Sequence, residues 1–322
     1  MSGPVAEVEK IPIYIAKGLR HPQKPPREHT QDILRSTISE IMNTFLPDNL
    51  LGTNILVKPN LLKAGDPLCV TPPETILATA TILKDMGAKV MVADSPAFGT
   101  AKKVLKSLGI INELQRRGIE VSSLKDPVRK RLPCGIRIGI SRTALEAGLI
   151  VNIPRLKAHC QMGVTAAVKN TFGTVVGFRK AMAHTLYGGD RALFSAMILE
   201  ISQLLPPGLN MVDATTIMHV TGPSGGNPLS LGLILASPSA VAVDTSAYHI
   251  LGLAPGQVPL WHTALERNLY GSRLEDLRFI KEDLRAIQLP TRVSMPKDLQ
   301  PLTFNPMRLL RGRIKSLLKK LF

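Results

Sequence analysis

The sequence is poor in cysteine, and this shortage excludes several classes of protein. Its three cysteines (Cys69, Cys134 and Cys160) are widely spaced among 322 residues and form no CxxC pair. Neither a disulfide framework nor a structural zinc site is therefore indicated. Because iron–sulfur clusters of the ferredoxin type are held by four thiolates, the cysteines of this chain alone cannot hold one. A reducing compartment fits this pattern best.

Aromatic residues and long apolar runs are also scarce. Aromatic residues make up 4% of the chain and do not interleave with its basic clusters, so stacking platforms for single-stranded nucleic acid are not indicated. No apolar run approaches the roughly 18 residues of a membrane-spanning helix. The N-terminus is polar and carries acid, unlike a secretory signal peptide. We expect a soluble cytoplasmic protein, and a hypothesis of nucleic-acid binding would rest on its positive charge alone.

Acidic residues are outnumbered, with 24 Asp and Glu against 40 Lys and Arg and a net charge of +16. This excess favours anionic partners such as phosphorylated ligands or lipid headgroups. Six of the positive charges lie in residues 306–322, which contain no acid. The excess charge therefore belongs partly to the body of the chain and partly to its tail.

Short apolar runs alternate with amphipathic helices, which predicts an α/β fold with a largely parallel or mixed sheet and helices on both faces. The expected strands lie at 11–17, 53–58, 88–94, 119–124, 135–141, 148–154, 209–213 and 231–237. The expected helices lie at about 30–45, 71–87, 100–108, 110–117, 142–147, 162–170, 191–205 and 239–252. In the TPPE segment, Thr71 and Glu74 have the spacing of a capping box. The basic KDPVRKRLP segment (125–133) is typical of a surface turn.

The chain divides into three parts by composition. Residues 1–281 form the α/β domain, with a division into two lobes near 125–150 as an alternative. Residues 282–305 are spotted with proline and predict a linker. Residues 306–322 alternate leucines with arginines and lysines, which is typical of an amphipathic helix in an anionic membrane interface. Docking of this tail on its own domain or on a partner is the alternative.

Polar side chains follow several expected strands, where parallel sheets bind their ligands. These candidate ligand-binding residues are Lys58, Asn60, Asp94, Ser95, Arg155, Asn170 and Asp213. Arg155, Lys157 and His159 alternate in an extended segment and would point to one side. The following helix would return Lys169 and Asn170 towards them. We expect these groups to form a cradle for a small anion, with a solvated basic loop as the alternative.

Four residues are candidates for catalysis. A buried Lys157 or Lys169 with a lowered pKa could act as nucleophile or base. His159 and His184 could carry protons, and with Asp213 they could bind a divalent metal, although no spacing demands one. A lone histidine such as His184 is more often structural.

Two further features are ambiguous. Gly225 and Gly226, in the TGPSGGNP loop, permit close approach of a phosphate to the backbone, but an ordinary hairpin turn fits equally well. Asp244 could be a carboxylate in a ligand cleft or a helix cap.

The segments ILVKPNLL, VMVADSP, VNIPRLKAH, VTAAVKNTFG, MVDA and AVAVD occur here in the order seen in domain-of-unknown-function family 362, which the chain resembles over roughly residues 10–280. Many proteins of that family carry a ferredoxin-like cluster domain, which implies reductive chemistry or electron transfer. This chain lacks such a segment, so the resemblance implies a ferredoxin-type partner that would supply the cluster.

The chain also resembles, more distantly, the nickel-pincer lactate racemases, in which a lysine holds a nucleotide-derived cofactor. The resemblance would give that role to Lys169, before Phe172 and Gly173, with His159 and His184 as proton carriers. The glycine-rich run expected before that lysine is replaced by VTAAV.

Three functional hypotheses follow. The first is an enzyme or binding protein for a small anionic metabolite or cofactor precursor, such as a phosphorylated one: Lys58, Lys157 and Lys169 bind the anion, while Asp94 and Asp213 orient it or hold a metal. The second is a non-catalytic accessory protein of a redox system, held at a membrane surface by its tail. The third is a racemase-like isomerase.

Overall fold

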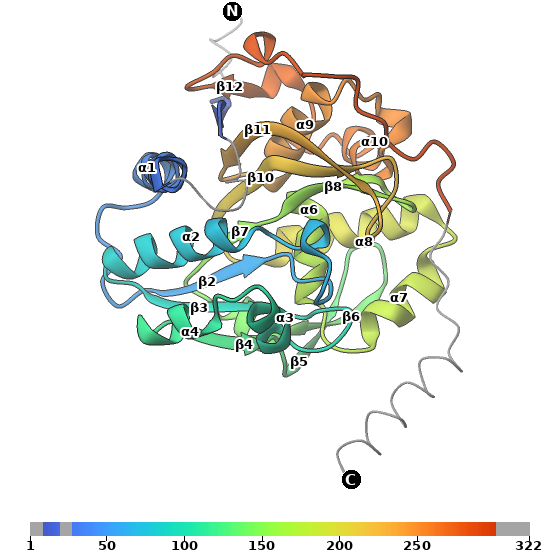
Figure 1. Cartoon of the computed structure of the whole chain (residues 1–322). Helices are drawn as coiled ribbons and strands as arrows, with labels where there is room; N and C mark the ends of the chain where they lie inside the picture. Colours follow the sequence, from blue (N-terminus) through green and yellow to red (C-terminus); the bar gives the residue numbers. More distant parts are fainter. Residues whose placement is uncertain (1–8, 20–27, 301–322) are drawn as a thin grey trace, which may run out of the picture.

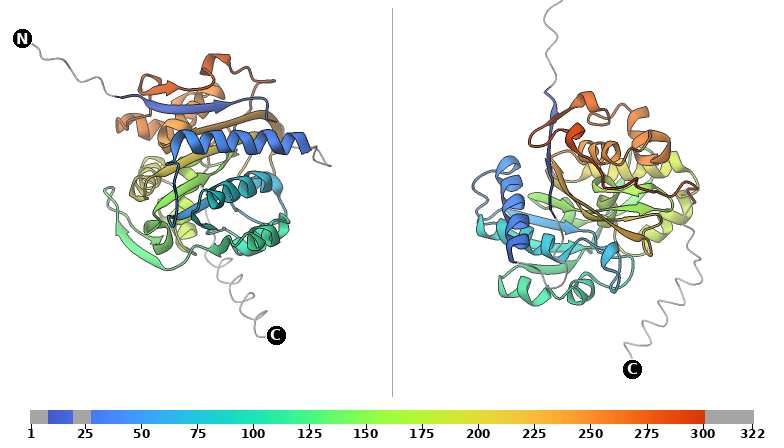
Figure 2. Two further views of the ribbon diagram at one scale, coloured as in Figure 1. Left: turned by 90° about the vertical axis from the view of Figure 1, so that its left-hand side faces the viewer. Right: turned by 45° about the horizontal axis from the view of Figure 1, so that its top comes forward.

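A mixed β-sheet with helices on both faces organises the chain, as Figures 1 and 2 show. The computed structural model describes residues 9–19 and 28–300. The predicted α/β fold class is confirmed. The predicted basic helix at 306–322 lies outside the described residues.

The expected alternation of strands and helices is present along the described chain. The strands are β1 (Ile11–Ala16), β2 (Asn54–Pro59), β3 (Lys89–Asp94), β4 (Glu120–Ser123), β5 (Pro127–Arg131), β6 (Arg137–Ser141), β7 (Leu149–Ile153), β8 (Arg155–His159), β9 (Gly163–Thr165), β10 (Gly208–His219), β11 (Asn227–Ser237) and β12 (Leu277–Phe279). The α-helices are α1 (Glu28–Phe45), α2 (Pro73–Asp85), α3 (Ala101–Ser107), α4 (Ile111–Arg116), α5 (Arg142–Leu145), α6 (Ala167–Thr171), α7 (Arg179–Tyr187), α8 (Arg191–Leu204), α9 (Ala240–Ile250) and α10 (Pro259–Glu266).

The main sheet has the strand order β12-β1-β11-β10-β7-β2-β3-β4. The strands from β10 to β4 are parallel to one another, whereas β11 is antiparallel to both of its neighbours. Chain order runs outward in one direction through β2, β3 and β4 and in the other through β7 and β10. The order therefore reverses between β2 and β7, and ligands of open α/β sheets bind beyond the carboxyl ends of the strands at such a point.

Apolar side chains fill both faces of the sheet. One cluster joins α1, α2, α3 and α4 to one face, and another joins α9 and α10 to the opposite face. Strand β1 illustrates the alternation, because Tyr14 packs in the first cluster while Ile13 and Ile15 pack in the second. Both faces of the sheet are thus covered, which leaves the ends of the strands as the place for polar chemistry.

Strand β8 continues beyond β7 and carries polar side chains past the sheet's core. After Pro154 the chain stays extended and pairs in parallel with β10, and on its other side β8 pairs with β9. The sequence predicted an extended loop here, followed by a helix over 162–170. The structure corrects this prediction, because Gly163–Thr165 forms β9 and the helix begins only at Ala167.

Two further local predictions are wrong. The basic segment predicted as a surface turn forms β5, which pairs with β6 in an antiparallel hairpin. Thr71 does not cap α2: the N-cap position is Pro72, without a side-chain cap. Instead the Thr71 hydroxyl accepts a hydrogen bond from the Asn60 amide at 2.8 Å and donates to the Ile153 carbonyl at 2.6 Å. It joins the loop after β2 to the end of β7.

Residues 282–300 are irregular apart from a short 3₁₀ turn at Leu284–Ala286. They nevertheless pack on the body of the protein: Val293 and Met295 lie against the cluster of α9 and α10, and the Gln300 amide donates to the Cys160 carbonyl at 2.9 Å. Within residues 9–19 and 28–300, no helix has the length and apolarity required to cross a membrane.

Candidate functional site

Lys58 and Asp94 form a buried ion pair at the reversal point of the sheet. Lys58 is the penultimate residue of β2, where it lies opposite Asn152 of β7, and Asp94 is the last residue of β3. The Lys58 Nζ donates to Asp94 Oδ1 at 2.8 Å, and the Leu61 amide donates to Asp94 Oδ2 at 2.9 Å. Lys58 is 0% exposed and Asp94 is 3% exposed. Because the pair is buried, removal of either partner would leave the other as an unpaired buried charge.

The AVKNTFG segment ends in Gly173, which lies directly beside the ion pair of Lys58 and Asp94. A Cβ atom added to this glycine would lie 2.4 Å from Asp94 Oδ1 and 2.5 Å from Lys58 Nζ. Any side chain here would displace the ion pair, so the segment after α6 can lie this close to it because the residue is glycine.

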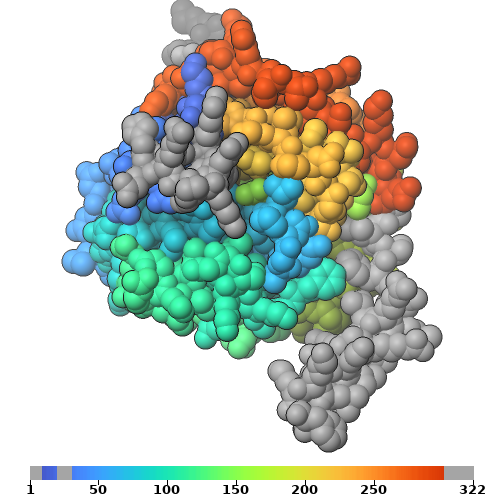
Figure 3. All heavy atoms as spheres, viewed as in Figure 1, coloured from blue at the N-terminus to red at the C-terminus, as the bar shows by residue number. Residues whose placement is uncertain are grey.

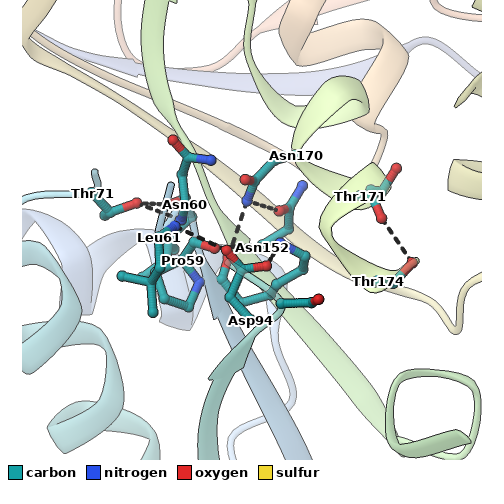
Figure 4. Close-up of polar contacts among 12 residues, drawn as sticks. Pro59, Asn60, Leu61, Thr71, Asp94, Asn152, Asn170, Thr171 and Thr174 are labelled. Carbon is teal, nitrogen blue, oxygen red and sulfur yellow. Dashed lines mark hydrogen bonds and ion pairs between the residues drawn. The ribbon is translucent and has the colours of Figure 1, made fainter. Parts of the chain in front are cut away.

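Three buried asparagines hold α6 on the sheet (Figure 4 shows two of them). Asn170 donates to the Lys58 carbonyl at 3.2 Å and to Asn152 Oδ1 at 2.8 Å. Asn152 in turn donates to the Ala167 carbonyl at 3.0 Å and to Asn210 Oδ1 at 2.9 Å. The amides thus link β2, β7, β10 and both ends of α6. They fix the position of Lys169, which lies between these anchors.

Arg155, Lys157 and His159 lie at alternating positions of β8 and are each 5% exposed. Lys157 Nζ donates to Asn60 Oδ1 and, at 2.9 Å, to the Cys69 carbonyl. Lys157 therefore fastens the loop between β2 and α2 onto β8. Figure 3 shows this loop lying against the β10–β11 hairpin.

Arg155 is buried without a partner. Within the described chain its guanidinium makes no hydrogen bond or ion pair, and its Nε is buried and unsatisfied. Burial lowers the pKa of Arg155, against the attraction of Asp213 and Glu74. A buried guanidinium normally has hydrogen-bonded partners, because desolvation of an unpaired charge costs several kcal/mol.

Lys169 projects from α6 over two aromatic rings. Its Nζ lies 4.2 Å from the centre of the Phe172 ring and 5.8 Å from that of Phe194. Within the described residues it has no hydrogen bond or ion pair. Asp244 of α9 accepts from the Ala167 amide at 2.6 Å and the Val168 amide at 3.1 Å, so it caps α6 from a neighbouring helix. Of the two interpretations of Asp244 from the sequence, a ligand-cleft carboxylate or a helix cap, these contacts are those of a helix cap.

Helix α7 adds two groups to the same region. Lys180 Nζ donates to the Ser95 carbonyl, and His184 Nδ1 lies 2.8 Å from Gln161 Oε1. Gln161 Nε2 donates to the Gly188 carbonyl, which fixes the orientation of the amide and makes its oxygen the acceptor. His184 therefore carries its proton on Nδ1, and Nε2 is its acceptor nitrogen.

Burial lowers the pKa values of three lysines, and neighbouring positive charges add to the effect. Burial lowers the pKa of Lys169 to about 7, assisted by the charges of Lys180, Lys157 and Lys58. Burial also lowers the pKa of Lys157 to about 8, against the effect of the Cys69 thiol and with that of Arg155. The pKa of Lys180 falls to about 8 because of burial, although Asp94 opposes the shift. These groups lie close enough to influence one another, as expected of a single cationic cluster.

Both histidines are neutral at physiological pH. Burial and the neighbouring Lys169 lower the pKa of His159 well below its usual value and that of His184 to about 2. His159 Nδ1 accepts from the Gln161 amide at 3.1 Å, so its proton lies on Nε2. In these tautomers His159 offers a donor and His184 an acceptor.

Asp213 is the register partner of Arg155 in the pairing of β10 with β8 and attracts its charge, but no hydrogen bond joins the two side chains. Asp213 lies within β10 rather than at its end, and its carboxylate accepts from the hydroxyls of Thr75 and Thr215. Gly225 and Gly226 lie in the β10–β11 hairpin. The described residues contain no group of three His, Cys, Asp or Glu side chains placed to hold a metal ion, and His159, His184 and Asp213 do not form one.

Sequence reasoning missed Lys180, Asn152 and Gln161. Asn152 had a signal, since it is a polar residue inside the apolar LIVNI strand. Lys180 and Gln161 follow no predicted strand, and their roles depend on how α7 folds back over β8.

Comparisons with known proteins identify the family. Residues 55–249 match the model of the domain of unknown function family DUF362, and the chain belongs to this family. It is 32% identical over 267 residues to a thylakoid-associated protein of the cyanobacterium Synechocystis sp. (strain PCC 6803), covering 82% of this chain and 83% of the relative. The solved lactate racemase apoprotein from Thermoanaerobacterium thermosaccharolyticum is similar over 64% of this chain, with a TM-score of 0.43 and 13% identity. The match spans 51% of that structure, about half its length.

Proposed function

We propose that this protein binds a small, multiply charged anion beside β8 and α6 and acts on it by proton transfer. The observation that carries the proposal is buried cationic charge without hydrogen-bonded partners among the described residues: the Arg155 guanidinium makes no hydrogen bond, although Asp213 on the neighbouring strand attracts it, and Lys169 faces aromatic rings instead of a carboxylate. Functional sites are where burial and like charges combine to perturb pKa values. A ligand anion would supply the missing countercharge.

The cations differ in the parts that they would take. The planar guanidinium of Arg155 suits a carboxylate or phosphate group, which it can bind with two parallel hydrogen bonds. Lys58 is already neutralised by Asp94, so we assign it a structural part in the site. Lys157 shares its donors with Asn60 and Cys69 and would contribute attraction at longer range.

Lys169 is the candidate for chemistry. An amine with a pKa of about 7 exists in both protonation states near neutral pH, which suits a general base or acid. Its neutral form could also attack a carbonyl carbon and form an imine with loss of water. The neutral His159, with its proton on Nε2, could donate a hydrogen bond to an oxygen of the ligand.

Isothermal titration calorimetry with pyrophosphate tests the proposal. Lys157→Ala/Lys169→Ala should reduce the affinity at least tenfold. The exposed pair Lys102→Ala/Lys103→Ala on α3 is the charge-matched control and should change the affinity less than twofold. Wild-type affinity in Lys157→Ala/Lys169→Ala would contradict the proposal. Native mass spectrometry of the purified protein would give the mass of any retained ligand.

A second candidate is attachment to an anionic membrane through residues 306–322, whose composition of leucines with six cations favours it. The thylakoid association named for the cyanobacterial relative is compatible with this proposal. Removal of residues 306–322 should reduce co-sedimentation with anionic vesicles, and unchanged pelleting would contradict it. The redox-accessory and racemase-like hypotheses stay predictions.

A further inference from the structure

We propose that α7 and the β5–β6 hairpin form a docking face for an anionic lipid bilayer. This face is made of described residues only, and it does not include Arg155, Lys157 or Lys169 of the proposed ligand site. Three observations carry the proposal: an exposed apolar stripe, arginines on one side of the hairpin, and the side of the molecule on which the described chain ends.

The apolar stripe runs along the outer side of α7. Phe178, Met182 and Leu186 are four residues apart, so they lie on the same side of the helix. Their exposed fractions are 45%, 45% and 63%. Ala183 and His184, between them, face inward and are buried. A helix with cations and a row of large exposed apolar side chains has the character of an interfacial helix.

The arginines are placed by the register of the hairpin. Arg129 of β5 lies opposite Gly139 of β6, and Arg131 lies opposite Arg137. A Cβ atom on Gly139 would lie 2.8 Å from the Arg179 side chain, so Arg179 covers that face of the hairpin. Since directly opposed residues point to the same face, the side chains of Arg129, Arg131 and Arg137 share the face on which the first residue of α7 lies.

Charge selects the occupant of this face. Residues 127–141 and 174–189 contain cations and no Asp or Glu. The chain's own tail is cationic and would be repelled, whereas an anionic lipid surface attracts the arginines and accepts the apolar side chains. Nucleic acid would match the charge but would leave Met182 and Leu186 without apolar surroundings.

The described chain ends close to the docking face. Arg191, just after α7, donates to the Leu299 carbonyl, so the described chain ends beside the junction of α7 and α8 (Figure 1). The described chain therefore ends on the same side of the molecule as the docking face.

Co-sedimentation with vesicles tests the proposal on the full chain, using phosphatidylcholine alone or mixed with phosphatidylglycerol. Wild type should bind only the mixed vesicles. Arg129→Gln/Arg131→Gln should bind them about 25-fold more weakly, at about fivefold per arginine. Met182→Glu/Leu186→Glu should bind at least tenfold more weakly. The double variants leave Lys180 and His184 in place, and circular dichroism checks that each folds.

Matched controls come from the opposite edge of the sheet and from other surfaces. Arg278→Gln/Arg285→Gln removes two exposed arginines near β12, and Leu51→Glu/Phe98→Glu alters two exposed apolar residues. Both should bind within twofold of wild type. Equal binding by the docking-face variants and their controls would overturn the proposal, as would failure of wild type to bind the mixed vesicles.

Two further outcomes would replace the lipid with another occupant. If removal of residues 306–322 raised amide hydrogen exchange in α7, the tail would be the occupant. If wild type were a dimer that Met182→Glu/Leu186→Glu converted to a monomer, the occupant would be a second copy of the chain. Either result would overturn the proposal.

Discussion

Lys58 and Arg155 are two buried cations near strand ends in one sheet, but their surroundings differ. Lys58 is 0% exposed and donates to Asp94 at 2.8 Å, while Arg155 is 5% exposed and has no partner among the described residues. The first charge is neutralised within the fold. The second is available for a ligand. Burial of a cation therefore says little about function until its partners are known.

The largest expected effect is on stability, when the partner that neutralises Lys58 is removed. Asp94→Asn would leave Lys58 as an unpaired buried charge, so the free energy of unfolding should fall by about 3–5 kcal/mol. Urea denaturation measures this change. Asp85→Asn removes an exposed partner of Arg35 and should cost less than about 1 kcal/mol. If both variants lost the same small amount of unfolding free energy, Asp94 would not be neutralising a buried charge on Lys58.

A smaller effect is expected on ligand affinity when the pH changes the charge of Lys169, which has no carboxylate partner among the described residues. Because the pKa of Lys169 is about 7, its charge disappears as the pH rises from 6 to 8.5. The affinity for pyrophosphate should fall by up to about tenfold over this range, the equivalent of one pKa unit of interaction. Lys169→Met should weaken this effect without abolishing all pH dependence, because Lys157 and Lys180, with pKa values of about 8, also lose charge over this range. Calorimetry at both pH values measures the two variants side by side, since the deprotonation of pyrophosphate itself is common to both. The same change of affinity with pH in wild type and in Lys169→Met would contradict this assignment.

Stability should respond to pH in the opposite direction. An unfolded lysine keeps its proton up to about pH 10.4, whereas folded Lys169 releases it near 7. Between these values the unfolded chain binds more protons, so the free energy of unfolding rises with pH. This contribution should be absent in Lys169→Met, as denaturation at pH 7 and 9 would show.

The smallest expected change distinguishes Arg155 most sharply from Lys58. Arg155→Met removes a charge that has no hydrogen-bonded partner among the described residues and keeps most of the apolar volume. The free energy of unfolding should stay within about 1 kcal/mol of wild type or rise, because replacement of buried charge by a well-packed apolar group is often neutral or stabilising. The affinity for pyrophosphate should nevertheless fall. A loss of 3 kcal/mol or more in urea denaturation would assign Arg155 to the fold instead of the ligand.

The sequence predicted eight of the twelve described strands, because their apolar runs are short, regular and bounded by polar residues, and it missed β5, β8, β9 and β12. It also pointed to Lys58, Lys157, His159 and Lys169, since strand ends of a parallel sheet converge. What it could not supply was the pairing: nothing local shows that Asp94 neutralises Lys58 or that Arg155 is left unpaired. Those facts depend on contacts between residues far apart in the chain.

The errors have the same origin. The TPPE segment has the local pattern of a capping box, but the Thr71 hydroxyl bonds to Asn60 and Ile153, which only the fold brings near. The KDPVRKRLP segment has the composition of a turn, yet pairing with β6 makes it a strand. Lys180 has no nearby motif, and it joins the site because α7 returns across the end of β3.

Helix α7 is nine residues long, and its two sides belong to different environments. Met182 and Leu186 face outward, while Lys180 and His184 reach the Ser95 carbonyl and Gln161. A tilt or partial unwinding of this one helix would withdraw an ammonium and an imidazole together. Binding at the outer side of α7 would therefore be coupled to the positions of Lys180 and His184 on its inner side. Hydrogen exchange of the α7 amides would detect a change on either side.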